Sequence, residues 1–92
     1  DATGAIPVSS TKPMHGHTLG AAGALEFVIT LQALRSGSLP PTAFLDTPDP
    51  ACALLHIAGR AMHGRTVRAA LSNSFAFGGS NVALIVAQYP PF

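Results

Sequence analysis

The segment from Thr18 to Ser36 constrains the fold of this chain most, because its composition and its end signal predict a single long helix. Gly37 follows directly, at the position where glycine commonly ends a helix. One face carries mostly small residues together with Glu26, while Phe27 belongs to a face of larger apolar residues. A helix that is apolar on several sides is expected to be buried on several sides. Its internal glycines weaken a helix relative to alanine, which suggests that another backbone approaches closely.

The composition agrees with a buried helix, since only 10% of the 92 residues are charged and 48% are hydrophobic. An average soluble domain carries about 25% charged residues. A chain this short buries only about 60–65% of its unfolded surface. It therefore either packs against more protein or was cut from a longer chain. The net charge of +1 gives no electrostatic footprint for nucleic acid.

Neither a membrane span nor a metal site is predicted. The longest apolar stretch is interrupted by Glu26 and Gln32, and a central carboxylate is costly in a bilayer. The single cysteine, Cys52, excludes an internal disulfide, and the histidine pairs have no carboxylate or second cysteine beside them. A lone cysteine suits the reducing cytoplasm, which is the expected location.

The remaining segments predict an α/β chain in the order strand, helix, loop, strand, strand, with one mixed sheet and one buried helix layer. We expect strands at Ile6 to Ser10, Leu54 to Ala58, Val67 to Phe75 and Val82 to Ala87, and loops at Thr11 to Gly16, Leu39 to Pro50 and Gly59 to Gly64. A Gly-rich turn at 78–81 predicts that the last two strands form an antiparallel pair. The last strand is almost continuously apolar and should be covered on both faces.

The first candidate for chemistry is the turn from Lys12 to His17, between a strand and the helix. The positive end of a helix dipole disfavours an imidazolium at His17, and a neutral imidazole can donate a hydrogen bond to developing negative charge. A solvated lysine and a capping histidine explain the same pattern, and the spacing alone favours that structural interpretation. Glu26, the only Glu, must be paired or protonated if it is buried, and Lys12 is a candidate partner.

The second candidate is the segment N-S-F-A-F-G-G-S-N at 73–81. Gly78 and Gly79 permit positive φ and let a ligand approach the backbone amides. Phe75 and Phe77 point the same way if the strand continues, so a hairpin with a Phe core is an equally good interpretation. Cys52 lies in a Pro/Asp-rich loop without a neighbouring base and is interpreted as structural.

These segments together resemble the β-ketoacyl-[acyl carrier protein] synthases, the elongating condensing enzymes of fatty-acid and polyketide synthesis. Val8 to Glu26 is similar to the family pattern S-S-T-K-x-x-x-G-H-x-x-G-A-A-G-x-x-E, and Asn73 to Asn81 to the turn N-S-F-G-F-G-G-T-N. The chain departs from the pattern at His15, where Thr is usual, at Ala76 for Gly and at Ser80 for Thr. These variants look similar to the nodulation-type synthases.

The resemblance implies a thiolase-like fold of two βαβαββ halves in a five-layer sandwich. Residues 1–92 then form the C-terminal part of the second half, an incomplete domain. The implied activity is acyl transfer by decarboxylative Claisen condensation of malonyl-carrier protein with an acyl thioester. The implied partners are acyl carrier protein, whose phosphopantetheine carries the substrates, and a second copy of the parent chain. No other cofactor is expected.

The resemblance also implies roles for single residues. His17 matches the histidine that stabilises the enolate, Lys12 matches the lysine that organises it, and Glu26 matches the glutamate that pairs with the lysine. Phe77 matches the gating residue of a mobile loop that contributes to the oxyanion hole and that here includes Phe75, Gly78, Gly79 and Asn81. The family nucleophile, a cysteine, and its first histidine lie upstream, so we expect the 92 residues alone to be inactive.

Two other functions remain open. A non-catalytic, chain-length-factor-like partner subunit shares this architecture, although such subunits tend to lose residues equivalent to Lys12 and His17. A thiolase-superfamily enzyme that does not decarboxylate is the other alternative. The combination of G-H-x-x-G, a Gly-rich turn and Lys12 favours the decarboxylating branch.

Overall fold

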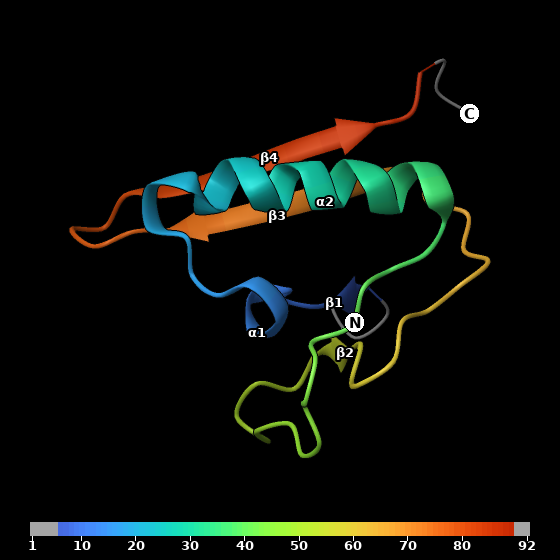
Figure 1. Cartoon of the computed structure of the whole chain (residues 1–92), viewed down its shortest axis with the longest axis horizontal. Helices are drawn as coiled ribbons and strands as arrows, with labels where there is room; N and C mark the ends of the chain where they lie inside the picture. The colour runs from blue at the N-terminus through green and yellow to red at the C-terminus, as the bar shows by residue number, and fades with distance from the viewer. Residues whose placement is uncertain (1–5, 90–92) are drawn as a thin grey trace. The chain divides into compact units, whose positions relative to one another are not determined.

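The computed structural model describes residues 6–89, which form two compact units (Figure 1). Within these residues, unit 1 comprises 6–17 and 38–65, and unit 2 comprises 18–37 and 66–89. The elements are β1 (Pro7–Val8), α1 (Lys12–His15), the 3-10 turn η2 (Leu19–Ala21), α2 (Ala22–Ser36), β2 (Leu55–His56), β3 (Ala69–Phe75) and β4 (Asn81–Ala87).

Unit 1 is built around a short parallel pair. In this pair β1 lies beside β2, with Val8 opposite His56. The ladder continues beyond the strands, because Ile57 N–H donates to Val8 O at 3.1 Å and Thr42 N–H donates to Ile57 O at 2.8 Å. Ile57 is only 4% exposed and forms the buried point of the unit. A further bridge joins Leu39 to Met62.

Unit 2 is a helix on an antiparallel hairpin, with α2 lying along β3 and β4 (Figure 1). The β3–β4 ladder is continuous from the pair Ala69–Ala87 to the pair Phe75–Asn81, which confirms the predicted antiparallel pairing. Exposure alternates along β3, so that Ser74 is half-buried towards α2 while Phe75 points to the other face. Ala22 and Leu34 are the buried residues of α2.

A side-chain clasp closes the end of unit 2 where α2 finishes. The Gln88 carboxamide donates to Leu34 O at 3.3 Å and to Val67 O at 3.0 Å, and Gln88 N–H donates to Arg68 O at 3.1 Å. One side chain thus ties the last turn of the helix to the chain just before β3. A carboxamide suits this role because its NH₂ group supplies two donors.

The helix end is confirmed, whereas its predicted start at Thr18 is too early. Gly37 caps α2 in the left-handed conformation, with φ 72° and its N–H bonded to Ala33 O at 3.0 Å. At the other end, η2 precedes α2, and no side-chain cap bond begins either element. The predicted loop from Thr11 to Gly16 is also wrong in part, because Lys12–His15 form α1. Pro13 is compatible with that short helix because it lies in the first turn, where its missing N–H is not needed.

The predicted mixed sheet and buried helix layer are not what the described residues form. There are two separate two-stranded sheets, one parallel and one antiparallel. The helix is buried only at Ala22 and Leu34, and Val28 is 53% exposed, because the one hairpin of unit 2 covers one side of the helix. Nor is a close backbone approach seen at Gly23, where an added Cβ would meet Ser74 Oγ at an ordinary 3.7 Å.

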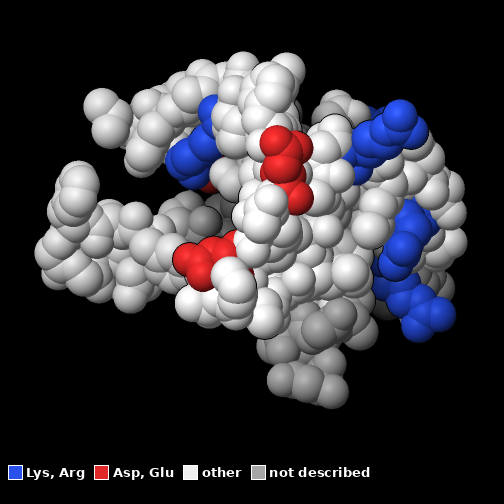
Figure 2. Space-filling model, turned by 90° about the horizontal axis from the view of Figure 1, so that it is seen from below, with Lys and Arg blue, Asp and Glu red and all other residues white. Residues whose placement is uncertain are grey.

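The described surface is largely uncharged and partly apolar. Figure 2 shows few charged side chains on the face that it presents. On the sheet face of unit 2 that points away from α2, Leu71 and its cross-strand partner Ile85 are 52% and 71% exposed. The cover that was predicted for both faces of the last strand is therefore absent on this face within residues 6–89. In this same part of the chain, no helix is long and apolar enough to span a membrane.

Candidate active site

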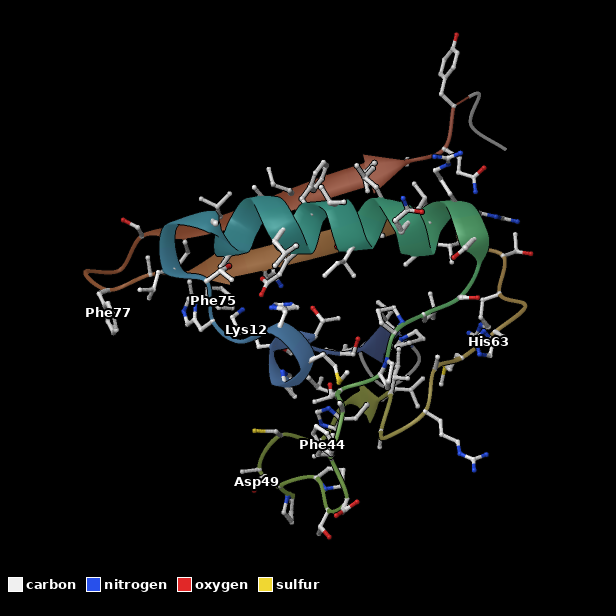
Figure 3. The ribbon with its side chains drawn as sticks, viewed as in Figure 1. Lys12, Phe44, Asp49, His63, Phe75 and Phe77 are labelled. Carbon is white, nitrogen blue, oxygen red and sulfur yellow. The ribbon has the colours of Figure 1, made fainter. Side chains whose placement is uncertain are left out.

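The predicted pair Lys12 and His17 lies on the turn that carries α1, in unit 1. Lys12, the first residue of α1, is half-buried (Figure 3). His17 follows the helix and is exposed. Between them, Gly16 caps the helix with φ 83° and ψ 172°, and its N–H donates to Lys12 O at 2.7 Å. Glycine adopts this conformation readily, whereas a residue with a Cβ is strained in it. The backbone therefore explains why a glycine stands at position 16, as in the family pattern.

His15 stands where the family pattern usually has Thr. Its ring makes two short hydrogen bonds on the same turn. Its Nε2 lies 2.7 Å from Thr11 Oγ1, and its Nδ1 lies 2.7 Å from Gly16 O. Sequence reasoning missed this arrangement. The available signal was the spacing, because residues four apart on a helical turn are neighbours.

Glu26 belongs to the other unit, on α2, where it is half-buried. Its backbone carbonyl accepts a hydrogen bond from the Thr30 hydroxyl at 2.8 Å. Since Lys12 and Glu26 belong to different units, their pairing stays a prediction.

The Gly-rich turn joins β3 to β4 at the tip of the hairpin. Ala76 N–H donates to Ser80 O at 2.8 Å, and both Gly78 (φ 84°) and Gly79 (φ 87°) have positive φ as predicted. Phe77 is fully exposed and projects from this tip (Figure 3). Phe75, the last residue of β3, is also exposed, so these residues do not form the Phe core that the alternative interpretation requires.

Asn81, the last residue of the predicted loop, is the first residue of β4 and pairs with Phe75. The backbone orientation of Asn81 is therefore fixed by its pairing with Phe75 in the β3–β4 ladder. Phe77 and the two glycines instead lie on the connecting turn, where no ladder restrains them. Positive φ at consecutive residues can direct amides towards a ligand. In this structure the Gly79 N–H donates to Ala76 O at 3.3 Å, within the turn itself.

Cys52 lies on an exposed turn and carries a free thiol. Its N–H donates to Asp49 O at 2.8 Å, while Asp49 Oδ1 accepts the Ala51 N–H at 2.9 Å. His56 contacts the backbone of Cys52 instead of its sulfur, since His56 Nε2 donates to Cys52 O at 2.7 Å. Among residues 6–89 no group of His, Cys, Asp and Glu could hold a metal ion.

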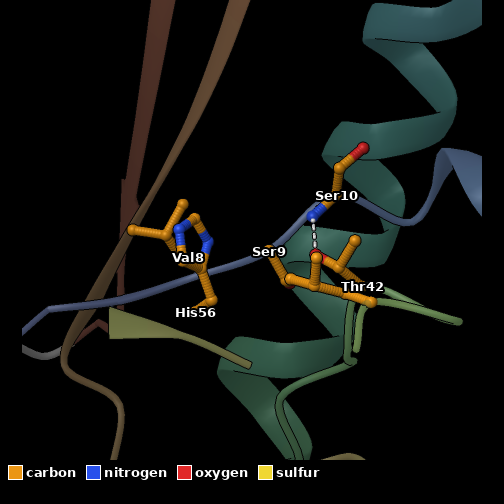
Figure 4. A pocket seen from close by; sticks show the side chains of 6 residues that line it. Val8, Ser9, Ser10, Thr42 and His56 are labelled. Carbon is orange, nitrogen blue, oxygen red and sulfur yellow. Dashed lines mark hydrogen bonds between the residues drawn. The ribbon is translucent and has the colours of Figure 1, made fainter. Parts of the chain in front are cut away.

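A shallow pocket of about 330 Å³ lies in unit 1 (Figure 4). Ser10 N–H donates to Thr42 Oγ1 at 2.9 Å at its edge, and Ser9 Oγ donates to Pro40 O at 2.7 Å. The pocket is lined by Val8, Ser9, Ser10, Thr42, Leu45 and His56. None of these is a predicted site residue, although Val8, Ser9 and Ser10 begin the family-like motif, and the other lining residues come from separate segments.

A helix on an antiparallel hairpin, a short parallel pair and two motif-bearing turns place the chain in the α/β class. Residues 1–46, half of the chain, match the family described as "Beta-ketoacyl synthase, C-terminal domain". The chain therefore belongs to the β-ketoacyl synthase family, as the two motifs predict.

Curated relatives match almost the whole chain. A protein named 3-oxoacyl-[acyl-carrier-protein] synthase 2, from Synechocystis sp., is 48% identical over 84 residues, which are 91% of this chain and 20% of the relative. The chloroplastic 3-oxoacyl-[acyl-carrier-protein] synthase II of Arabidopsis thaliana is 46% identical over 91% of this chain and 16% of its own length. The chain thus spans about a fifth or less of the length of these relatives.

Nodulation protein E of a Rhizobium strain is also 46% identical, over 90% of this chain and 20% of its own length. Its similarity is no greater than that of the synthases. The likeness of the His-Gly-His and Phe-Ala-Phe variants to nodulation-type proteins therefore does not assign a pathway to this chain.

Proposed function

We propose that this chain is the C-terminal part of a β-ketoacyl-[acyl carrier protein] synthase, an acyltransferase that condenses malonyl-carrier protein with an acyl thioester. The observation that carries the proposal is the identity of 46–48% with proteins named as such synthases, over about nine-tenths of the chain. That span is long enough to include at least part of both candidate segments. Acyl carrier protein is then the partner that presents both substrates on phosphopantetheine, and no further cofactor is needed. We expect a homodimeric parent in the cytoplasm.

The chemistry divides into two bond changes. The bond between the malonyl α-carbon and its carboxylate breaks, CO₂ leaves, and the electron pair becomes the enolate of the thioester. The α-carbon then forms a bond to the carbonyl carbon of the acyl group, and the thiolate that carried this group leaves. Negative charge thus develops on a thioester oxygen in both steps, and preorganised hydrogen-bond donors stabilise it.

In this proposal His17 is the donor to the enolate oxygen. It stands just after Gly16, whose backbone conformation directs the chain out of α1, and it is exposed to a bound substrate. Lys12 is five residues earlier, at the start of the same turn, and organises His17 with the help of Glu26. A neutral imidazole suits the role because it donates one hydrogen bond without placing a full charge beside the cation.

The hairpin tip of unit 2 carries the second group of proposed site residues. We assign Phe77 as a gate because it is fully exposed at a turn that two glycines with positive φ make. The amides of this turn then contribute to the oxyanion hole for the acyl thioester, and Asn81 anchors the turn to β4.

The acyl-accepting cysteine is not among the residues of this chain in the proposal, because Cys52 is exposed and the neighbouring His56 ring binds its backbone carbonyl instead of its sulfur. The isolated 92 residues are therefore inactive in acyl transfer. Turnover of an acyl thioester by the isolated chain would contradict this statement. Sequencing the parent gene supplies a second check, since a synthase carries a cysteine at a strand-to-helix turn and a partner subunit carries another residue there.

The test of the proposed function is His17→Ala in the full-length parent. Malonyl decarboxylation should fall by about 100-fold or more, as for loss of an oxyanion donor. Acylation of the nucleophile should change by less than about 10-fold, because that step uses the hairpin amides. Equal loss of both steps would overturn the role of His17, and unchanged decarboxylation would overturn the proposed function.

A further inference from the structure

The ring of His15 joins the two ends of the turn that carries the candidate catalytic pair. Thr11 directly precedes α1 and Gly16 directly follows it. His15 Nε2 lies 2.7 Å from Thr11 Oγ1, and Nδ1 lies 2.7 Å from Gly16 O. One half-buried side chain thus bridges both flanks of the helix.

The two contacts define which nitrogen carries the proton. A carbonyl oxygen only accepts hydrogen bonds, so Nδ1 of His15 is the donor to Gly16 O. In the neutral ring, Nε2 then accepts the proton of the Thr11 hydroxyl. The structure agrees with this use of the hydroxyl, because Thr11 stands at the N-cap of α1 and makes no side-chain cap bond there.

The residues that the ring holds are the immediate neighbours of the candidate catalytic pair. Lys12 follows Thr11, and His17 follows Gly16. Two backbone bonds also cross this span: Met14 N–H donates to Thr11 O at 2.9 Å, and Gly16 N–H donates to Lys12 O at 2.7 Å. The backbone of Gly16 is thus held at both of its polar atoms, because its N–H binds Lys12 O and its carbonyl oxygen binds His15 Nδ1. These two bonds set the direction in which the chain continues to His17.

We infer that His15 is a positioning residue for His17 and Lys12, acting through the Thr11–His15–Gly16 clamp. The inference rests on the proposed function, since it assigns the clamp to the decarboxylation step. The ring does not act on the reacting atoms. It holds the backbone from which the His17 side chain starts, and small displacements of a catalytic group are costly to rate.

The test uses amide side chains that replace one ring nitrogen at a time, in the full-length synthase. His15→Asn places an amide nitrogen near the Nδ1 position and lacks any group at Nε2, whereas His15→Gln places its amide near the Nε2 position and lacks the Nδ1 donor. Thr11→Val removes only the hydroxyl. Thr66→Val, at an exposed position, is the matched control and should leave all rates unchanged.

Malonyl decarboxylation and acylation of the nucleophile are measured separately for each variant. Thr11→Val should lower decarboxylation by about 3- to 10-fold, the size of one hydrogen bond, with acylation and KM unchanged. The same substitution should have a similar effect in the His15→Gln background and none in the His15→Asn background, where the partner of the hydroxyl is already absent.

Equal effects of Thr11→Val in all three backgrounds, or no effect in any, would overturn the clamp. A parallel loss of acylation would show a merely structural role and would overturn it as well. The proposed function fails separately, because His17→Ala with intact decarboxylation would refute it whatever the His15 variants do.

Discussion

The two units of the chain are held together in different ways. Unit 2 has a 15-residue helix on a continuous ladder from Ala69 to Phe75, with regular backbone bonds throughout. Among the described residues, strand pairing in unit 1 is confined to Pro7–Val8 with Leu55–His56. The rest of the unit has single bridges, the short helix α1, isolated backbone bonds and side chains that bond to backbone. The comparison teaches that the candidate residues are divided between a turn held by side-chain bonds in unit 1 and a hairpin tip with two positive-φ glycines in unit 2.

The largest expected loss of stability comes from truncating the most buried large side chain of each unit. Leu34 and Ile57 are 5% and 4% exposed, and truncation of either to alanine should lower the free energy of unfolding by about 2–4 kcal/mol. Hydrogen exchange distinguishes the units. Leu34→Ala should release the amides of α2 and β3, and Ile57→Ala those around Thr42. Uniform loss of protection in both variants would mean that the two units unfold as one.

The Gln88 clasp should be the next most costly feature to remove. Gln88→Ala leaves the carbonyls of Leu34 and Val67 without these donors, which should cost about 1–2 kcal/mol. Chemical denaturation measures the loss. Gln32→Ala, at an exposed position on α2, is the matched control and should change stability by less than about 0.5 kcal/mol. Equal effects of the two substitutions would show that the clasp contributes nothing.

The helix end gives a smaller effect. Gly37→Ala forces a residue with Cβ into the left-handed conformation at φ 72° and should destabilise unit 2 by about 1 kcal/mol. Gly20→Ala is the contrasting substitution, because Gly20 has no positive φ and an added Cβ there meets nothing within 4 Å among the described residues. It should be neutral or slightly stabilising by thermal melting. Destabilisation by Gly20→Ala alone would contradict this assignment.

The smallest effect is expected at a side-chain bond of unit 1. Thr42→Val removes the oxygen that accepts the Ser10 N–H at 2.9 Å and should cost about 0.5–1 kcal/mol. Exchange of the Ser10 amide should accelerate as well. Thr47→Val, in the exposed loop, should leave that amide unchanged. Unaltered exchange in Thr42→Val would mean that the bond does not restrain this part of the unit.

Unit 2 could be predicted from the sequence because its signals are periodic and local. The helix end at Gly37, the antiparallel pair and the positive φ of Gly78 and Gly79 each follow from residue types at fixed spacing. The helix start was missed because no capping side chain marks it. The predicted burial of the helix was too high. The composition shows how apolar the helix is, but it does not show whether this chain contains the elements that would cover it.

Unit 1 was less predictable for a physical reason. Its helix α1 contains Pro13 within four residues, too few for any periodicity, and its pocket is lined by segments remote in sequence. The membership of the family was predicted from two motifs and is confirmed over residues 1–46. The roles of Lys12, His17, Glu26 and Phe77 stay predictions, because they depend on substrates and on side chains from elsewhere.

The division of the chain into units is interleaved, and this has a consequence for how the protein can be cut or assembled. The backbone passes from one unit to the other at 17–18, at 37–38 and again at 65–66. Each unit therefore consists of two stretches that the other interrupts. During synthesis the helix emerges before the hairpin on which it lies, so unit 2 cannot be complete until residues 66–89 have been made. A single cut at any of these three crossings would therefore separate the two stretches of at least one unit.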